Sequence, residues 1–120
     1  MPNPVVHWEI NSKNPKKLWK YYGDLFGWKI EEMPMPGMTY GMVDTKEKTG
    51  AGGGIGQAQG PNSVVFYVEV ADVNAMLKKA EQAGGKTVMK PQTIPGMVTF
   101  AHFSDPDGNV IGLSHMEAPH

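Results

Sequence analysis

The two halves of this 120-residue sequence show the same order of features at a fixed offset of 58 residues. Each half begins with a strand-like run, continues with a capped helix that ends at glycine, and finishes with three further strand-like runs. Caps, helix ends and turn residues that agree in register indicate an internal repeat. The corresponding residues are His7 and Val65, Asn14 and Asp72, Gly27 and Gly85, Ile30 and Val88, Gly54 and Gly112, and, with one extra residue, Pro36-Gly37 and Pro95-Gly96.

This repeat predicts an α+β fold of two tandem βαβββ modules that form an incomplete curved barrel around a cleft. We expect a single domain over residues 1–120, since this length buries a sizeable core. Module one is expected at about residues 5–58, a linker at about 59–62, and module two at about 63–116. Pockets are common at such module junctions, so the cleft is the expected ligand site.

In module one, a helix is expected to cover the apolar side of the first strand. Residues 5–11 alternate apolar and polar side chains, which places Val6, Trp8 and Ile10 on one side of a strand. Asn14 before Pro15 is a typical helix start. The helix is predicted at 15–26 with an apolar stripe of Leu18, Trp19, Tyr22, Leu25 and Phe26, its end at Gly27, strands at 28–33, 38–44 and 51–58, a break at 34–37 and a polar loop at 45–50.

Module two contains the strongest turn signal of the chain. Asp105-Pro106-Asp107-Gly108 combines a proline that presets φ, aspartates that accept from local N–H groups, and a glycine that tolerates positive φ. Apolar runs on both sides make the stretch a predicted hairpin. The other predictions are strands at 63–71, 86–89, 97–103 and 109–115, a helix at 73–83 with Asp72 as N-cap, a stop at Gly84-Gly85, and a break at Pro95-Gly96.

Charge and composition exclude several classes of function. A net charge of −1 without a basic run argues against binding of nucleic acid or an acidic membrane. The absence of cysteine excludes disulfides, thiolate zinc sites and cysteine nucleophiles. The start Met1-Pro2-Asn3-Pro4 lacks the features of a signal peptide, and no long apolar run occurs, so a soluble, cytoplasmic protein is expected.

Candidate ligand-binding residues come from strand faces that should line the cleft. His7, Glu9 and Asn11 form the polar face of the first strand, and the offset places Val65, Tyr67 and Glu69 on the same face of module two. Tyr40 and Tyr67 suit a pocket because each combines an apolar ring with a hydroxyl group. His102 lies on a cleft-lining strand without a defined face, and Gly112 lies two residues beyond Val110 on the last strand.

Several short stretches, in this order and spacing, resemble the vicinal oxygen chelate superfamily of glyoxalases, extradiol dioxygenases and bleomycin- or fosfomycin-resistance proteins. The resemblance runs from His7 to Met116 and is closest to small glyoxalase-like members. By resemblance, we expect a homodimer. The stretches are Val6-His7-Trp8-Glu9-Ile10, Tyr21-Tyr22 with Phe26-Gly27-Trp28, Val70-Ala71-Asp72-Val73, Ala83-Gly84-Gly85-Lys86 and Ser104-Asp105-Pro106-Asp107-Gly108-Asn109.

The resemblance also implies where a metal would lie. In the superfamily's metalloenzymes, a divalent ion binds residues of the first and fourth strands of each module, positions that fall here on His7, Val65, Gly54 and Gly112. Only His7 has a side chain that binds metal, and a stable site needs about three protein ligands. No metal cofactor is therefore expected. A shifted divalent-metal site of His7 and Glu9, completed by the other module or a second subunit, is the alternative.

His7 and the methionines each have a functional and a structural interpretation. His7 is either a general acid or base, with Glu9 as its partner, or a neutral histidine that only makes a hydrogen bond. The methionines form either an adaptable wall for a ligand or, as we favour, filling of a core or dimer interface. Trp8 and Trp28 are expected in the core. The methionines in question are Met33, Met35, Met38 and Met42.

Three functions remain open from the sequence. The first is metal-independent binding of a small apolar or amphipathic molecule, because Val65, Gly54 and Gly112 would open and dry the cleft. The second is a glyoxalase-like lyase, isomerase or dioxygenase that uses a shifted metal site or His7 and Glu9 as acid and base. The third is an interaction module whose cleft is filled by side chains.

Overall fold

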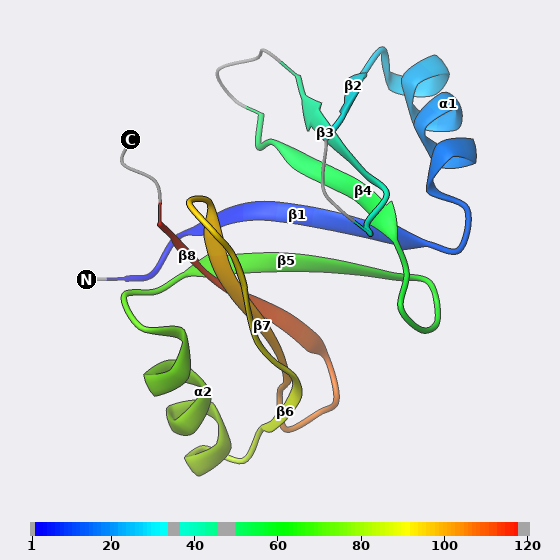
Figure 1. Cartoon of the computed structure of the whole chain (residues 1–120). Helices are drawn as coiled ribbons and strands as arrows, with labels where there is room; N and C mark the ends of the chain where they lie inside the picture. Colours follow the sequence, from blue (N-terminus) through cyan, green and yellow to red (C-terminus); the bar gives the residue numbers. More distant parts are fainter. Residues whose placement is uncertain (1, 34–36, 46–49, 118–120) are drawn as a thin grey trace. The chain divides into compact units, whose positions relative to one another are not determined.

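The computed structural model describes residues 2–33, 37–45 and 50–117, which form eight strands and two helices (Figure 1). The order βαβββ occurs twice, so the predicted α+β class and its internal repeat are confirmed. Most of the predicted break at 34–37 and of the polar loop at 45–50 lies outside the described residues. The elements are β1 Val5–Ser12, α1 Pro15–Phe26, β2 Lys29–Glu32, β3 Tyr40–Asp44, β4 Gly53–Gln57, β5 Ser63–Glu69, α2 Val73–Gln82, β6 Lys86–Ile94, β7 Val98–Ser104 and β8 Val110–Met116.

The chain divides into two compact units, one of residues 7–65 and one of residues up to 6 together with those from 66 onward. In the first unit the strand order is β2-β3-β4-β1, with β1 parallel to β4 and the other pairs antiparallel. In the second unit the order is β5-β8-β7-β6, with β5 parallel to β8 and the other pairs antiparallel. The two half-sheets thus have the same topology, as the repeat predicts.

Helix α1 begins and ends as predicted. The Asn14 side chain accepts a hydrogen bond from the Lys17 backbone N–H at 3.4 Å, and Pro15 occupies the first turn, where a missing N–H costs nothing. Gly27 ends the helix with φ of 71° and donates its N–H to the Gly23 carbonyl at 2.9 Å. These local signals are sufficient to set both boundaries.

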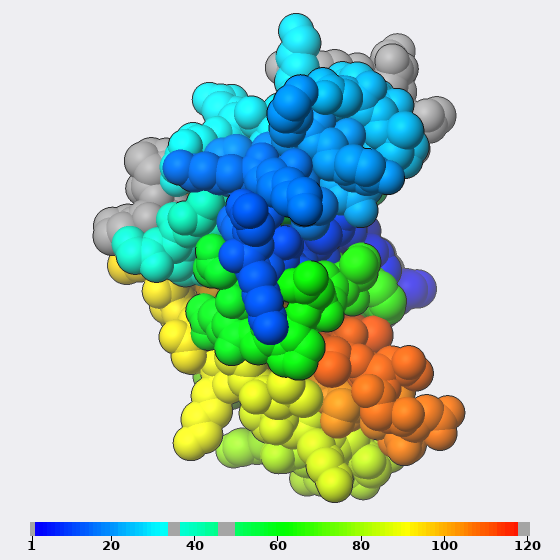
Figure 2. Space-filling view, turned by 90° about the vertical axis from the view of Figure 1, so that its right-hand side faces the viewer, coloured from blue at the N-terminus to red at the C-terminus, as the bar shows by residue number. Residues whose placement is uncertain are grey.

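The apolar stripe of α1 is only partly covered by the sheet. Trp19 lies against the strands and donates its indole N–H to the Ile55 carbonyl at 2.9 Å. Leu25 and Phe26 are each 56% exposed, so the predicted packing of the whole stripe is wrong for the last turn. The Phe26 ring still contacts Trp28, with 5.0 Å between ring centroids. In Figure 2, α1 (mid-blue) lies at the surface of the molecule.

Helix α2 packs on the second half-sheet with smaller side chains. The Asp72 carboxylate accepts a hydrogen bond from the Ala75 N–H at 3.0 Å, which confirms the predicted N-cap. Val73 and Leu77 are the buried residues of the helix. They form one apolar cluster with residues of the strands, which are Val70, Ala101 and Leu113.

Strand β6 is longer than its sequence indicates. The predicted strand stops at Met89, whereas the observed strand continues to Ile94 and includes Pro91. Proline is tolerated because β6 is the terminal strand in its unit's order, where a ladder hydrogen bond can be absent. The pairing with β7 shifts register between Thr87 and Met89 and again between Met89 and Gln92, which accommodates the irregular stretch.

The turn between β7 and β8 confirms the predicted hairpin. The Asp105 carboxylate accepts hydrogen bonds from the backbone N–H groups of Asp107 and Asn109, each at 2.9 Å, and from the Asn109 side chain. Gly108 has φ of 90°, in the region that other residues avoid. Hydrogen bonds from Asn109 lower the pKa of Asp105, so its carboxylate is ionised at neutral pH.

Across the parts of the chain described here, neither helix has the length and apolar character needed to span a membrane.

Candidate functional site

The half-sheet of the first unit has a helix face and a back face. Trp8 lies on the helix face, since its ring contacts Trp28, which in turn stacks on Tyr22 of α1. Alternation along β1 then places His7 and Glu9 on the other side, as predicted. We term this side the back face, and its members in the first unit are His7, Glu9, Asn11, Tyr40, Met42, Gly54 and Gly56.

His7 and Tyr40 form a hydrogen-bonded pair on this back face. The His7 Nε2 and the Tyr40 hydroxyl oxygen lie 2.8 Å apart, and the two rings are nearly parallel. Burial lowers the pKa of His7 below its ordinary value of 6.5, while the nearby charge of Glu9 acts in the opposite direction. His7 is therefore a neutral imidazole at pH 7, able to accept a proton or to hold the tyrosine hydroxyl in one orientation.

The second unit holds the same kind of pair on its own back face. The Tyr67 hydroxyl oxygen and the His102 Nε2 lie 2.7 Å apart. His102 and Tyr67 are both register partners of Gly112, which settles the face of His102 that the sequence left open. An edge-on contact with the ring of Phe100 also holds Tyr67. The back face of the second unit comprises Tyr67, Glu69, Phe100, His102, Gly112 and Ser114.

Tyrosine rings occupy the space directly over the strand glycines Gly54 and Gly112. A side-chain carbon at Gly54 would overlap the ring and hydroxyl of Tyr40, and one at Gly112 would overlap the ring of Tyr67. Both tyrosines are buried, with 9% and 4% of their surface exposed. The expectation that these glycines open the strands to a ligand is thus wrong: they are small because a tyrosine ring lies directly over each.

The remaining predicted binding residues have structural partners within their units. Glu69 accepts hydrogen bonds from the Ser114 hydroxyl at 3.2 Å and the Met116 backbone N–H at 3.0 Å. Asn11 donates its side-chain N–H to the Ser63 hydroxyl at 3.3 Å. Val65 is buried, with 2% of its surface exposed. A role in ligand binding for these three residues stays a prediction.

The methionines of this stretch that the structure describes lie in different environments. Met42 lies on the back face opposite Gly54, whereas Met38 is 38% exposed. Met33 is half-buried and its backbone N–H bonds the Tyr40 carbonyl at 2.9 Å. Met35 lies outside the described residues. Met42 is thus the methionine of this stretch that the register places beside the His7–Tyr40 pair.

Comparison with known proteins places this chain in a family. The model of the Glyoxalase/Bleomycin resistance protein/Dioxygenase superfamily matches residues 5–113. The chain belongs to this superfamily. The predicted vicinal oxygen chelate resemblance is therefore confirmed, and the family's fold accounts for the repeated βαβββ order.

The individual proteins described next are similar to this chain at low sequence identity. Anthracycline biosynthesis protein DnrV of Streptomyces peucetius is 25% identical, in a match that covers 89% of this chain and 45% of the relative. The chain thus spans about half the length of that relative. A hypothetical protein from Bacillus halodurans C-125 matches in structure with a TM-score of 0.72 and 12% identity, covering 100% of this chain and 99% of the other. Methylmalonyl-CoA epimerase from Mycobacterium tuberculosis gives a TM-score of 0.68 and 15% identity, covering 96% and 88%.

The residues at the superfamily's metal positions do not fit a metal here. Members of the superfamily often use divalent ions, but Val65, Gly54 and Gly112 offer no side-chain donor, and tyrosine rings lie over both glycines. Within residues 2–33, 37–45 and 50–117, no group of three or more His, Cys, Asp or Glu side chains is placed to hold a metal ion. His7 alone carries a suitable donor, and it is engaged with Tyr40.

Sequence reasoning found the members of the two pairs but not the pairing. The sequence predicts Tyr40, Tyr67 and His102 as ligand-binding residues and His7 as a candidate acid or base, yet no pattern links a histidine to its tyrosine. The link depends on register between strands that are far apart in sequence, 33 residues for one pair and 35 for the other. Ser114, which binds Glu69, was missed, although its position two residues beyond Gly112 places it on the same face.

Proposed function

We propose that this protein binds small apolar or amphipathic molecules on the back face of each unit, without the metal site of its superfamily's metalloenzymes. The observation that carries this proposal is the Tyr40 ring over Gly54, hydrogen-bonded to His7, in the space where a fourth-strand metal ligand would stand. The half-buried rings of His7 and His102, each held by a tyrosine hydroxyl, suit a ligand that has both an aromatic surface and hydrogen-bonding groups.

The named relatives support an aromatic ligand. DnrV and the related DauV of Streptomyces sp. strain C5 carry the name of anthracycline biosynthesis, and anthracyclines are planar polycyclic molecules with oxygen substituents. In the second unit the buried Tyr67 ring contacts both Phe100 and His102, and these two half-buried rings are accessible to such a molecule. We infer that planar, oxygen-bearing aromatics are the ligand class to test first.

Calorimetric titration with an anthracycline and with a simple anthraquinone tests the proposal. Tyr40→Phe and Tyr67→Phe remove one hydroxyl each, and either change is expected to weaken binding about two- to tenfold. Tyr21→Phe is the matched control, since Tyr21 is 57% exposed on α1. Equal affinity in all three variants, or no binding of any planar aromatic, would contradict the proposal.

Acid–base catalysis is the second candidate, and the neutral His7 beside the Tyr40 hydroxyl favours it. An enzyme of this kind should lose turnover in His7→Ala or Glu9→Gln while the variant still binds ligand. A binding protein has no turnover to lose. The same variants therefore separate the two functions once a ligand is known.

The metal-dependent form of this second candidate has its own test. Metal analysis and melting of untagged protein with nickel, zinc, manganese, iron(II) and cobalt should show no bound metal and no shift if binding is metal-independent. Near-stoichiometric metal, or a large stabilisation by one ion, would move the assignment to a lyase, isomerase or dioxygenase with His7 and Glu9 as ligands.

We also propose that the protein is a homodimer. Large apolar side chains remain exposed in the first unit, among them Tyr21, Leu25 and Val64, with 57%, 56% and 73% of their surfaces accessible. Exposed apolar groups that lie together are typical of contact surfaces between subunits, and Tyr21 and Leu25 lie one turn apart on α1. Light scattering on the purified protein should give twice the mass of one chain, and a monomer mass would refute this assembly.

A further inference from the structure

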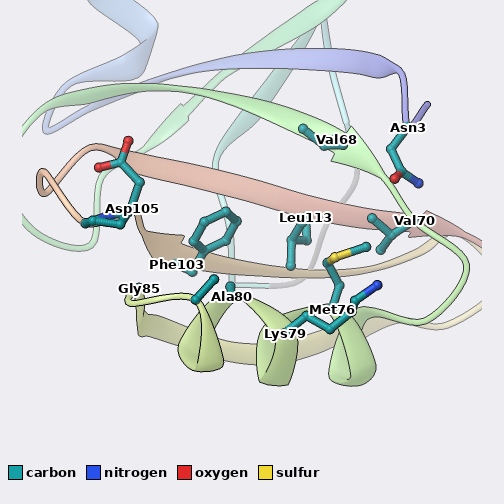
Figure 3. Close-up of a pocket in the computed structure, with 12 residues that line it drawn as sticks. Asn3, Val68, Val70, Met76, Lys79, Ala80, Gly85, Phe103, Asp105 and Leu113 are labelled. Carbon is teal, nitrogen blue, oxygen red and sulfur yellow. The ribbon is translucent and has the colours of Figure 1, made fainter.

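A cavity of about 350 Å³ lies between α2 and the second half-sheet. It is on the helix face, the side opposite Tyr67 and His102, and all its lining residues belong to the second unit. Figure 3 shows the side chains of the strands and of α2 that line it. The lining residues are Asn3, Val68, Val70, Met76, Lys79, Ala80, Ala83, Gly85, Phe103, Asp105, Pro106 and Leu113.

Small residues on α2 account for this cavity. After Leu77, which is buried in the core cluster, Lys79 has its place at one end of the cavity, and the other lining residues of α2 and its C-terminal end are only Ala80 and Ala83, followed by Gly85. These have little or no side chain to fill the space beside Phe103. In the first unit, the residue that corresponds to Ala80 by the 58-residue offset is Tyr22, whose ring stacks on Trp28. The second unit therefore leaves a mostly apolar volume within the size range of ligand pockets.

The polar residues of the cavity lie at its two ends. Lys79 and Asn3 are at one end and Asp105 is at the other, as Figure 3 shows. The Asp105 carboxylate is already used by the β7–β8 turn, where it accepts hydrogen bonds from Asp107 and Asn109. Lys79 has no recorded ion pair with any other residue that the structure describes. A ligand thus meets an available positive charge at one end only.

We propose that this cavity binds a straight-chain monocarboxylate, with the alkyl chain between α2 and the strands and the carboxylate beside Lys79. At about 350 Å³ the cavity lies near the lower end of the range for ligand pockets, which suits a medium-chain fatty acid such as decanoate. This site goes beyond the back-face function, because it lies on the other side of the half-sheet and shares none of the His–Tyr residues.

The two parts of the ligand should contribute unequally. Each additional methylene that enters the cavity is expected to raise affinity about fourfold. The contact between the carboxylate and Lys79 is at the exposed mouth, so removing the lysine charge should weaken binding only about two- to fivefold. Chain length therefore sets the affinity, and Lys79 sets the preference for an anion.

Methyl NMR titration with hexanoate, octanoate and decanoate, kept below their micelle concentrations, tests the site directly. We expect saturable shifts of the Val70, Ala80 and Leu113 methyl groups, with affinity rising along the series. Unchanged signals for these methyls, or shifts confined to back-face residues, would overturn the proposal. Because anthraquinone binding is followed separately at Tyr40 and Tyr67, failure here leaves the back-face proposal standing.

Two lysine variants distinguish the effect of the Lys79 charge at the cavity from the effect of lowering the positive charge of α2 in general. Lys79→Met keeps the apolar stem and removes the charge, so it should reduce the preference for decanoate over decylammonium. Lys78→Met is the matched control, since Lys78 is an exposed neighbour on α2 that does not line the cavity. Equal effects of the two variants would overturn the assigned role of Lys79.

Filling the cavity provides an independent test. Ala80→Leu places a larger side chain in the cavity and should abolish decanoate binding while anthraquinone titrations remain unchanged. If this variant does not fold, the chain-length series and the lysine pair still decide the question. Undiminished decanoate binding in folded Ala80→Leu would show that the acid binds elsewhere.

Discussion

The two units share a topology but fill their helix faces in different ways. In the first unit, the rings of Trp8, Trp19 and Trp28 pack between helix and strands, and Trp19 also bonds the Ile55 carbonyl. In the second unit, valine, leucine and alanine form the core, and a cavity remains under Ala80. The same arrangement of elements therefore tolerates a filled and a partly empty helix face.

The back faces of the two units share a His–Tyr contact, but the strands that carry the histidine and the tyrosine are exchanged between the units. In the first unit the histidine is on the first strand of the module and the tyrosine on the third, as His7 and Tyr40 show. In the second unit the tyrosine is on the first strand and the histidine on the third, as Tyr67 and His102 show. In both units the pair thus lies on the back face and joins the first and third strands of the module, while histidine and tyrosine have exchanged strands.

Substitutions on the helix faces should give the largest difference in stability loss between the two units. Trp19→Ala removes a large ring and a hydrogen bond, so we expect a loss of about 3 kcal/mol or more in the free energy of unfolding. Met76→Ala, on α2, should cost only about 1 to 2 kcal/mol, because Met76 is half-buried and already borders a cavity. Urea denaturation measures both. Equal losses would show that α2 is packed as tightly as α1.

The glycine positions under the tyrosine rings should respond alike in both units. Gly54→Ala and Gly112→Ala each force the overlying tyrosine to move, which should destabilise the protein by about 1 to 3 kcal/mol. Combining Gly112→Ala with Tyr67→Ala should cost less than the sum of the two single changes, because the overlap is relieved. Additive losses would mean that ring and glycine do not compete for the same space.

The hydroxyl groups of the two pairs should have similar, smaller effects. Tyr40→Phe and Tyr67→Phe each break one partly buried hydrogen bond to a histidine, with an expected loss of about 0.5 to 1.5 kcal/mol. Thermal unfolding of the two variants side by side provides the measurement. A loss of stability in only one of the two variants would show that the two His–Tyr pairs are not equivalent.

The lowered pKa of His7 should cause a small loss of stability at acid pH. Because burial lowers the pKa of His7 in the folded state, the unfolded chain binds the proton more readily. The stability that neutral His7 contributes to the folded state is fully present above pH 6.5. It is lost as the pH falls from 6.5 toward the lower pKa that His7 has in the folded state. His7→Gln should flatten this part of the stability profile between pH 7 and pH 5. An unchanged profile would indicate that His7 is not desolvated.

Local signals in the sequence predict much of the fold and little of the site geometry. Asn14, Gly27 and Asp72 set helix boundaries through contacts within a few residues, so their roles were predicted correctly. The continuation of β6 through Pro91 was missed, because it depends on the strand's terminal place in the order of its unit. Likewise, Gly54 and Gly112 carry no sign of the rings above them, since those contacts depend on strand register.

The close contact of glycine and tyrosine also limits how this chain could evolve. A mutation of Gly54 or Gly112 to histidine or glutamate, the change that would introduce a metal donor, meets an occupied position and destabilises the fold. Loss of the tyrosine alone leaves an empty space and removes a hydrogen bond from the histidine. Neither first step is favourable by itself, so a metal site at these positions would require two coordinated substitutions in the same lineage.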